Sequence, residues 1–329
     1  MRKLALSDEI LLSVDKAARY IGGEVNSVMK DKNKVDIRFA MCFPDVYEIG
    51  MSNLGMMILY NMFNEREDVW AERVFSPWLD LDKIMREKEI PLFALESQEP
   101  VKNFNFLGIT LGYEMCYTNV LQVLDLSHVS LLAKDREEDD PIVIGGGACA
   151  YNPEPIAEFF DMFYIGEGET VYDALFDAYK ANKAAGGSRK DFLFAASQIP
   201  GIYVPSLYNV TYKEDGTIAS FTPAREGVPE KVCKQLITDI TKEYRAIKAP
   251  VVPFIKATQD RVTLEIQRGC IRGCRFCQAG MIYRPTRERD VETLKASARE
   301  MLQNTGHEEI SLSSLSSSDY SELKELVNF

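Results

Sequence analysis

Strand-like apolar runs alternate with helix-like spacings along the N-terminal part of the chain. Apolar runs that predict buried strands occupy 35–43, 69–75, 106–114, 141–147 and 162–169. Helical patterns occupy 8–21, 52–63, 81–89, 119–127 and the region near 170–182. Ser7 is a suitable N-cap for the first of these helices. Because strands that alternate with helices build parallel sheets, we predict an α/β fold with a doubly wound parallel sheet.

The pattern changes twice after this region. Residues 203–224 alternate around Asp215 and Gly216, which predicts a β-hairpin. Residues 225–260 are mixed in character and contain several prolines, as is typical of a linker. A new α/β pattern follows, with strands at 261–266 and 309–315 and helices at 291–304 and near 319–327.

Asp290 and Gly306 flank the 291–304 helix as an N-cap and a C-terminal glycine. The patterns along the chain predict a division into four parts. These parts are an N-terminal helical extension (1–34), an α/β domain (35–200), a hairpin and linker (201–260), and a second α/β region (261–329).

Composition and charge restrict the class of protein. The chain has 329 residues, of which 46% are hydrophobic, so it can bury a core in about two domains. Asp8 and Glu9 interrupt the N-terminal apolar segment and argue against a secretory signal, and no apolar run approaches the roughly 18 residues of a membrane span. The net charge of −12 argues against broad non-specific nucleic-acid binding. Seven cysteines, most of them scattered, indicate free thiols in a reducing cytoplasm.

Three of the cysteines form a compact motif, "RGCIRGCRFCQAG", in which Cys270, Cys274 and Cys277 have the spacing C-x₃-C-x₂-C. Core cysteines are one interpretation, but the loop is rich in Arg and Gly. A structural zinc site is a second, but it usually needs a fourth ligand, for which His307 is the only later candidate. Three thiolates on one loop suit a 4Fe–4S cluster with one iron left open.

This motif resembles the cysteine loop of the radical S-adenosylmethionine (SAM) superfamily, in which the loop follows the first strand of a partial TIM-like barrel. Phe276 matches the aromatic residue before the last cysteine. The resemblance implies that 261–329 holds the first two βα units of such a barrel and that the three cysteines bind a cluster whose open iron chelates SAM. It also implies SAM-binding roles for Phe276 and for residues at the end of the second strand, here Ser313, Ser314 and Ser316, where many relatives have Gly-Gly-Glu.

Arginines are concentrated around the motif. The segment "YRPTRER" contributes Arg284, Arg287 and Arg289, which we expect to contact an anionic substrate. The alternative is a solvated basic face.

The order of an α/β sheet before this core resembles the cobalamin-binding radical SAM proteins, and in particular an uncharacterised family with "RGCxRGCRFCQAG" and "YRPxRER". Asp45 and Gly50 match the family's D-x-H-x-x-G turn, but Tyr47 replaces the histidine that ligates cobalt from below. Gly145 and Gly146 resemble a later glycine turn of that family. Cobalamin is therefore a candidate cofactor without a histidine lower ligand, and the alternative is that these glycines only form tight turns.

The resemblance implies an enzyme that reductively cleaves SAM at a 4Fe–4S cluster, for methyl transfer, sulfur insertion or rearrangement of an unknown substrate. We expect a reductant such as flavodoxin or ferredoxin, RNA as one candidate substrate, and no membrane partner. The alternative is a metal-stabilised binding module, RNA-associated and without radical chemistry. Because such a barrel usually has about six βα units, we expect this chain to be the N-terminal part of a longer protein and to be inactive alone.

Overall fold

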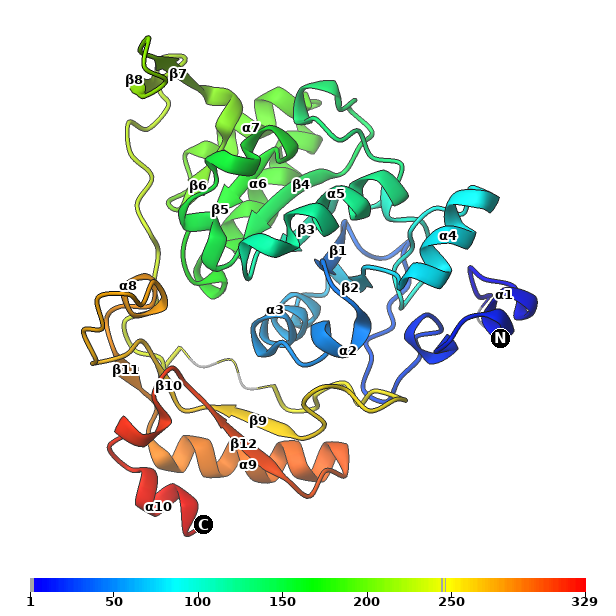
Figure 1. Ribbon diagram of the computed structural model, residues 1–329, viewed down its shortest axis with the longest axis vertical. Coiled ribbons are helices and arrows are strands. Elements are labelled where there is room, and N and C mark those ends of the chain that lie inside the picture. Colours follow the sequence, from blue (N-terminus) through cyan, green and yellow to red (C-terminus); the bar gives the residue numbers. More distant parts are fainter. Residues whose placement is uncertain (1–2, 244, 246) are drawn as a thin grey trace.

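The computed structural model describes residues 3–243, 245 and 247–329 and places a six-stranded sheet in the N-terminal part of the chain (Figure 1). The strands lie in the order β2-β1-β3-β4-β5-β6, and all neighbours are parallel except β5 and β6. Their bounds are β1 (Ile37–Phe43), β2 (Val69–Phe75), β3 (Phe106–Thr110), β4 (Ile142–Gly146), β5 (Met162–Tyr164) and β6 (Ile202–Tyr203). The protein is thus a mixed α/β fold with a largely parallel sheet.

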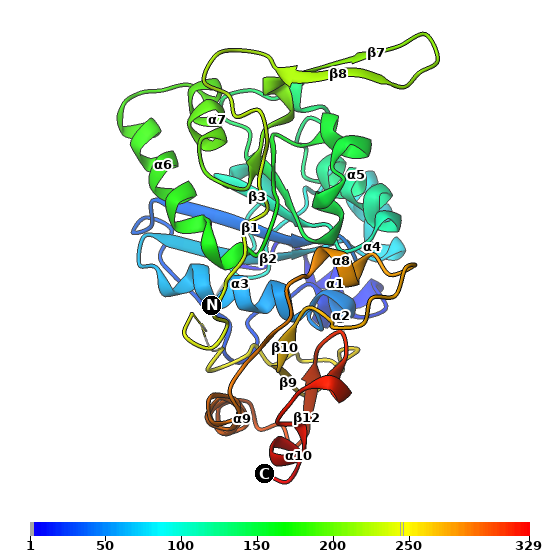
Figure 2. The ribbon, with the colours of Figure 1, turned by 90° about the vertical axis from the view of Figure 1, so that its left-hand side faces the viewer.

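Helices cover both faces of this sheet (Figure 2). The helices α3 (Leu54–Glu65), α6 (Tyr172–Ala184) and α7 (Arg189–Ser197) pack on one face, and α4 (Leu79–Lys88) and α5 (Tyr117–Leu126) on the other. In β1, Phe39 and Met41 belong to the hydrophobic core under α3, α6 and α7, whereas Ala40 and Cys42 belong to the core under α4 and α5. Since successive side chains of a strand point to opposite faces, a strand covered on both sides is continuously apolar, which explains the strand pattern of the sequence.

The C-terminal segment begins a second, smaller sheet. The strands β9 (Val262–Glu265) and β12 (Ile310–Ser313) pair in parallel, and the connecting helix α9 (Val291–Thr305) and the helix α10 (Leu323–Val327) share a core with them. The Asp290 side chain accepts a hydrogen bond from Thr293 N, and Gly306 follows α9 with φ 74°. Both expected ends of this helix are therefore confirmed.

Two short antiparallel pairs complete the strands. The strands β10 (Gln267–Arg268) and β11 (Arg287–Glu288) pair and enclose the cysteine loop. The hairpin of β7 (Tyr208–Tyr212) and β8 (Ile218–Pro223) projects from the molecule in Figure 1 and confirms the turn expected at Asp215–Gly216.

Several elements are shorter than the sequence predicts, including β3, β5 and α10, and two further differences concern the first helix and the edge of the sheet. The helix expected over 8–21 is only α1 (Asp8–Ser13), followed by a 3-10 turn at Ala17–Arg19. The chain becomes extended at Val14 (φ −92°, ψ 153°), and Asp15 N then donates to the Asp80 carboxylate of α4 at 2.8 Å, a contact that a local pattern does not encode. The sheet is also not wholly parallel, since the antiparallel edge strand β6 follows α7.

A buried ion network fixes the N-terminal extension to the sheet. Arg73 of β2 binds Glu24 through Nη2 at 2.8 Å and Glu96 through Nε at 2.6 Å, and all three side chains are fully buried. The hydroxyl groups of Tyr47 and Tyr60 donate to Glu24 and Glu96 respectively, each at 2.9 Å. Both carboxylates are thus paired and hydrogen-bonded, as buried charges require.

None of the described helices combines the length and the apolar character needed to cross a membrane.

Candidate functional site

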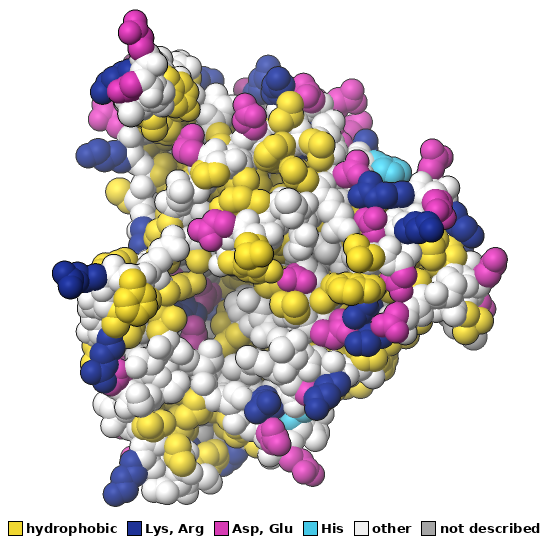
Figure 3. All heavy atoms as spheres, viewed as in Figure 1, with side chains coloured by type: hydrophobic (Ala, Val, Ile, Leu, Met, Phe, Trp, Pro, Cys, Tyr) yellow, Lys and Arg dark blue, Asp and Glu magenta, His cyan; other side chains and the backbone are white. Residues whose placement is uncertain are grey.

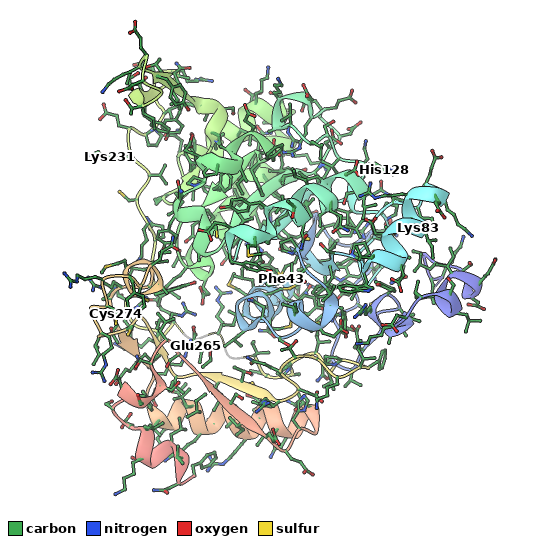
Figure 4. The ribbon with its side chains drawn as sticks, in the orientation of Figure 1. Phe43, Lys83, His128, Lys231, Glu265 and Cys274 are labelled. Carbon is green, nitrogen blue, oxygen red and sulfur yellow. The ribbon has the colours of Figure 1, made fainter. Side chains whose placement is uncertain are left out.

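The three motif cysteines lie on one loop beyond the carboxyl end of β9, and Figure 4 labels Cys274 on this loop and Glu265 at the end of the strand. The loop spans 269–286 and contains the single-turn helix α8 (Ala279–Ile282). Gly269 begins it with φ 81°, and a Cβ there would lie 2.7 Å from the carbonyl oxygen of Pro285. Glycine therefore allows the two ends of the loop to approach each other.

The thiols of this loop are accessible donors. All seven cysteines, each of them among the described residues, are free; Cys274 is exposed, and Cys270 and Cys277 are half-buried. The sulfur of Cys270 accepts a hydrogen bond from Arg272 N at 3.4 Å, and that of Cys277 accepts one from Gly280 N at 3.3 Å. Hydrogen bonds to sulfur stabilise thiolate ligands and tune iron–sulfur clusters.

The chemistry of the donors can be compared with that of a cluster. Thiolates are soft ligands, and in a 4Fe–4S cluster each cysteine binds a different iron. A Cβ at Gly273 would meet no atom within 4 Å, so the loop has open space beside it. The soft, free donors of this loop therefore fit the cluster.

An ion pair joins the cysteine loop to the turn after β12. Arg272 Nε donates to Asp319 Oδ2 at 2.8 Å, and the Ser316 hydroxyl donates to the same oxygen at 2.6 Å. These hydrogen bonds, that of Arg272 first, lower the pKa of Asp319. Sequence reasoning missed Asp319, because the residue that it binds is 47 positions away and no motif links the two.

A cavity of about 520 Å³ lies between the large sheet and the base of the cysteine loop. Its floor contains the carboxyl ends of β3, β4 and β5, including Thr110, Gly146 and Gly166, and the start of α3 forms one wall. Arg268 and Gly269 border it from the side of the cysteine loop. Ligands of open parallel sheets bind outside the carboxyl ends of the strands, and small-molecule sites have volumes of about 300–1,000 Å³. The cavity has the place and the size of a ligand site.

Only some of the candidate SAM-binding residues line the cavity. Ser313 and Ser314, at the end of β12, line the cavity. Ser316 lies one turn further and binds Asp319. Phe276 is 93% exposed on the cysteine loop. The two serines therefore share a cavity with the base of the loop, and Phe276 faces solvent.

Only one of the three candidate substrate-binding arginines is exposed. Arg284 is exposed, and Figure 3 shows basic side chains projecting from the region of the cysteine loop and α8. Arg287 and Arg289 are instead 8% and 3% exposed, and they form ion pairs with Glu167 and Glu265. Internal carboxylates thus occupy these two guanidinium groups, which corrects the expectation that they face an anionic substrate.

Two residues of the cobalamin-like motif belong to the core. Tyr47 is 1% exposed, and its hydroxyl donates to the buried Glu24. A Cβ at Gly50 would lie 2.2 Å from the Phe75 ring, so this glycine allows close packing of the helical turn α2 (Tyr47–Gly50) on β2. The position of the expected lower ligand therefore faces the interior of the sheet domain.

The other candidate residues of the cobalamin-like site are Asp45 of the same motif and the two glycines of the later turn, and only one of the three borders the cavity. Asp45 accepts a hydrogen bond from the Tyr113 hydroxyl at 3.0 Å. A Cβ at Gly145 would lie 2.8 Å from the Phe163 ring, whereas Gly146 lines the cavity. These residues do not build a histidine-type cobalamin site, and only Gly146 of the predicted set borders the space that a ligand would fill.

Cobalamin added to the protein is expected to have no axial nitrogen from a protein imidazole. Tyr47 is buried at the ligand position, and His128 and His307, both described, lie outside the cavity lining. Pulsed electron paramagnetic resonance (EPR) of Co(II)-cobalamin mixed with the protein checks this. The spectrum of a His128→Ala, His307→Ala variant should be the same as that of the wild type, and a histidine-ligated cobalt would show that the interpretation of Tyr47 is wrong.

Comparison with protein families gives two matches. Residues 55–205 match the family described as "Radical SAM proteins, N-terminal", and residues 264–329 match the "Radical SAM superfamily". The second match includes the end of β9, the whole cysteine loop and β12. The chain belongs to the radical SAM superfamily, a membership that implies a 4Fe–4S cluster and S-adenosylmethionine as cofactors.

A curated relative and two solved structures are similar over most of the chain. The chain is 27% identical over 293 residues to the uncharacterized protein MJ0966 of Methanocaldococcus jannaschii, covering 88% of this chain and 52% of that protein. Two structures of the radical SAM methyltransferase TsrM from Kitasatospora setae align with TM-scores of 0.46 and 0.49, at 13% and 12% identity. One contains tryptophan and a SAM analogue, and the other contains cobalamin and a [4Fe-4S] cluster. These alignments cover 88% and 89% of this chain and 50% of TsrM. The chain spans about half the length of the curated relative and of TsrM.

Proposed function

We propose that this chain is part of an enzyme that binds a 4Fe–4S cluster through Cys270, Cys274 and Cys277 and uses it to cleave SAM reductively. The observation that carries the proposal is the position of three free, accessible thiols on one loop, beyond the first strand of the smaller sheet, whose first residue Gly269 borders a cavity of about 520 Å³. Superfamily membership supports the cofactor assignment.

The residues of the site have separate tasks in this proposal. The three cysteines would hold the cluster, which would supply the electron for reductive cleavage of SAM. Ser313 and Ser314 contact SAM from the end of β12 through hydroxyl or backbone carbonyl oxygens. Arg272 and Asp319 keep the cysteine loop and the turn after β12 together.

Several finer assignments belong to the same proposal. We assign 1–34 to an extension, 35–200 to a cobalamin-binding-like domain, 201–260 to a hairpin and linker, and 261–329 to the start of the radical SAM core. The support for this division is that five strands of the large sheet lie within 37–164 and the smaller sheet lies within 262–313; the edge strand β6 extends the large sheet just beyond 200. A flavodoxin- or ferredoxin-type reductant in the cytoplasm would supply the electron, and exposed arginines such as Arg284 leave RNA as one candidate substrate.

Anaerobic reconstitution of the chain with iron and sulfide tests the proposal. The expected product is a brown protein with about four irons and four sulfides per chain, whose reduced-state EPR spectrum changes when SAM is added. The same protein reconstituted with zinc alone is the control. A colourless protein that retains one zinc and no iron would contradict the proposal and favour a metal-stabilised binding module.

A further inference from the structure

Two arginines face each other where the cysteine loop begins and ends. Arg268 of β10 and Arg287 of β11 are direct partners in the antiparallel register. Their side chains are 10% and 7% exposed, so solvent screens them little. Like charges directly opposite each other destabilise a strand pair, and a pair of two residues on each strand has little other stability. The closure of the loop therefore needs a counter-charge.

A carboxylate from the large sheet supplies this charge to both arginines. Glu167 lies in the loop after β5, 120 residues before Arg287. Its Oε1 accepts a hydrogen bond from Arg287 Nη2 at 2.6 Å, and its Oε2 accepts one from Arg287 Nη1 at 2.9 Å. The same Oε2 lies 3.2 Å from Arg268 Nη1. One side chain thus bridges the two strands that flank the cysteine loop.

The backbone around Glu167 is held in place by the linker. Gly166 has φ 140°, and a Cβ there would lie 2.3 Å from the carbonyl oxygen of Gln235. Glu167 N donates to that carbonyl at 3.0 Å, and Ile237 N donates to Glu167 Oε2 at 2.9 Å. Burial opposes the charge of Glu167, but the bonds from Arg287 and Ile237 outweigh it and lower the pKa of the carboxyl.

Further ion pairs extend this bridge. Arg268 also binds Glu169 and Glu265, and Arg289 binds Glu265. Three carboxylates and three guanidinium groups are thus joined, and the Lys234 ammonium adds a positive charge that interacts with Glu167 and Arg287. Loss of the Glu167 charge removes the carboxylate that pairs with Arg287, which is costly at a buried site.

We propose that Glu167 is a positioning residue that holds the cysteine loop of the smaller sheet against the cavity of the larger one. Glu167, Glu169, Glu265 and Arg268 all line that cavity, so the network lies between the space for a ligand and the loop that carries the thiols. The effect of Glu167 on a bound cluster rests on the proposed function, but its effect on the position of the loop can be tested in the chain without a cluster.

Hydrogen exchange of the metal-free chain, read peptide by peptide, tests the proposal in a Glu167→Gln variant. We expect the amides of 269–286 to exchange about tenfold faster or more than in the wild type. Opening of the loop in the variant no longer has to break the ion pairs of Glu167 with Arg268 and Arg287. Amides of β1, β3 and β4 should exchange at the wild-type rate. In reconstituted protein, the same variant should lose iron to a chelator faster and show a shifted EPR spectrum.

Two further variants make the result specific. Glu158→Gln removes an exposed carboxylate from the same part of the chain and should change neither measurement. Glu167→Asp keeps the charge and should give exchange between the wild type and Glu167→Gln. Unchanged exchange over 269–286, or an equal acceleration throughout the large sheet, would overturn the proposal. If the wild type takes up no cluster, the proposed function fails, while the exchange data still decide the role of Glu167.

Discussion

Replacement of Cys270, Cys274 or Cys277 by alanine is expected to lower the iron content of the reconstituted protein from about four per chain to near zero. Each thiolate binds a separate iron, so the other two cannot replace the missing ligand. Iron and sulfide analysis together with EPR of the reduced protein measures the loss. The fold should persist, because the three cysteines are exposed or half-buried on a loop.

The four other cysteines provide matched controls. Cys233 is exposed like Cys274 but lies in the linker, so Cys233→Ala should keep the full iron content. Cys42, Cys116 and Cys149 are buried, and burial raises the pKa of each thiol, which keeps them protonated and unsuited to bind iron. A requirement for any of these four in cluster assembly would contradict the assignment of the loop.

Arg73→Leu is expected to destabilise the protein by about 3–5 kcal/mol at neutral pH. The substitution leaves Glu24 and Glu96 without their cation, and the side chains of both are fully buried. A loss of this size is a large part of the ordinary stability of a domain, about 5–15 kcal/mol. Denaturant unfolding followed by circular dichroism measures it.

The pH dependence identifies the cause of this loss. In the variant, the buried Glu24 carboxyl lacks Arg73, so burial raises its pKa in the folded state above the unfolded value. The folded state then binds more protons, so the stability of the variant falls as the pH rises and its deficit shrinks toward pH values near 5. Arg86→Leu removes a half-exposed ion pair and should change stability by less than about 1 kcal/mol. A variant Arg73→Leu as stable as the wild type at neutral pH would contradict this account.

Local sequence patterns were enough to place most of the elements. A strand that is apolar on both faces, such as β1, can be identified from its own residues, because its burial does not depend on which partner covers it. The caps of α9 and the turn of the β7–β8 hairpin are likewise short-range features. The short edge strand β6 carries no such signal, since two residues beside a longer neighbour do not define a pattern.

The candidate site could be predicted only where its chemistry is contiguous. Cys270, Cys274 and Cys277 stand within eight positions of one another, so their spacing alone indicates a shared ligand, and the iron–sulfur prediction stays to be tested. Tyr47 could be recognised as a departure from a histidine motif. The sequence does not show, however, that its hydroxyl points to Glu24 inside the domain.

The sequence by itself therefore determined the fold class, most of the helices and strands, and the loop that holds the candidate ligands. Only the tertiary structure decided how charged residues are used. Arg287 and Arg289 belong to a basic segment that reads as a surface for anions, yet both are buried against carboxylates. The physical reason is that hydrophobic periodicity records which positions of an element are buried, but not which residues cover them. The partner of a buried charge is chosen by packing, and for Arg287 that partner, Glu167, is 120 residues distant.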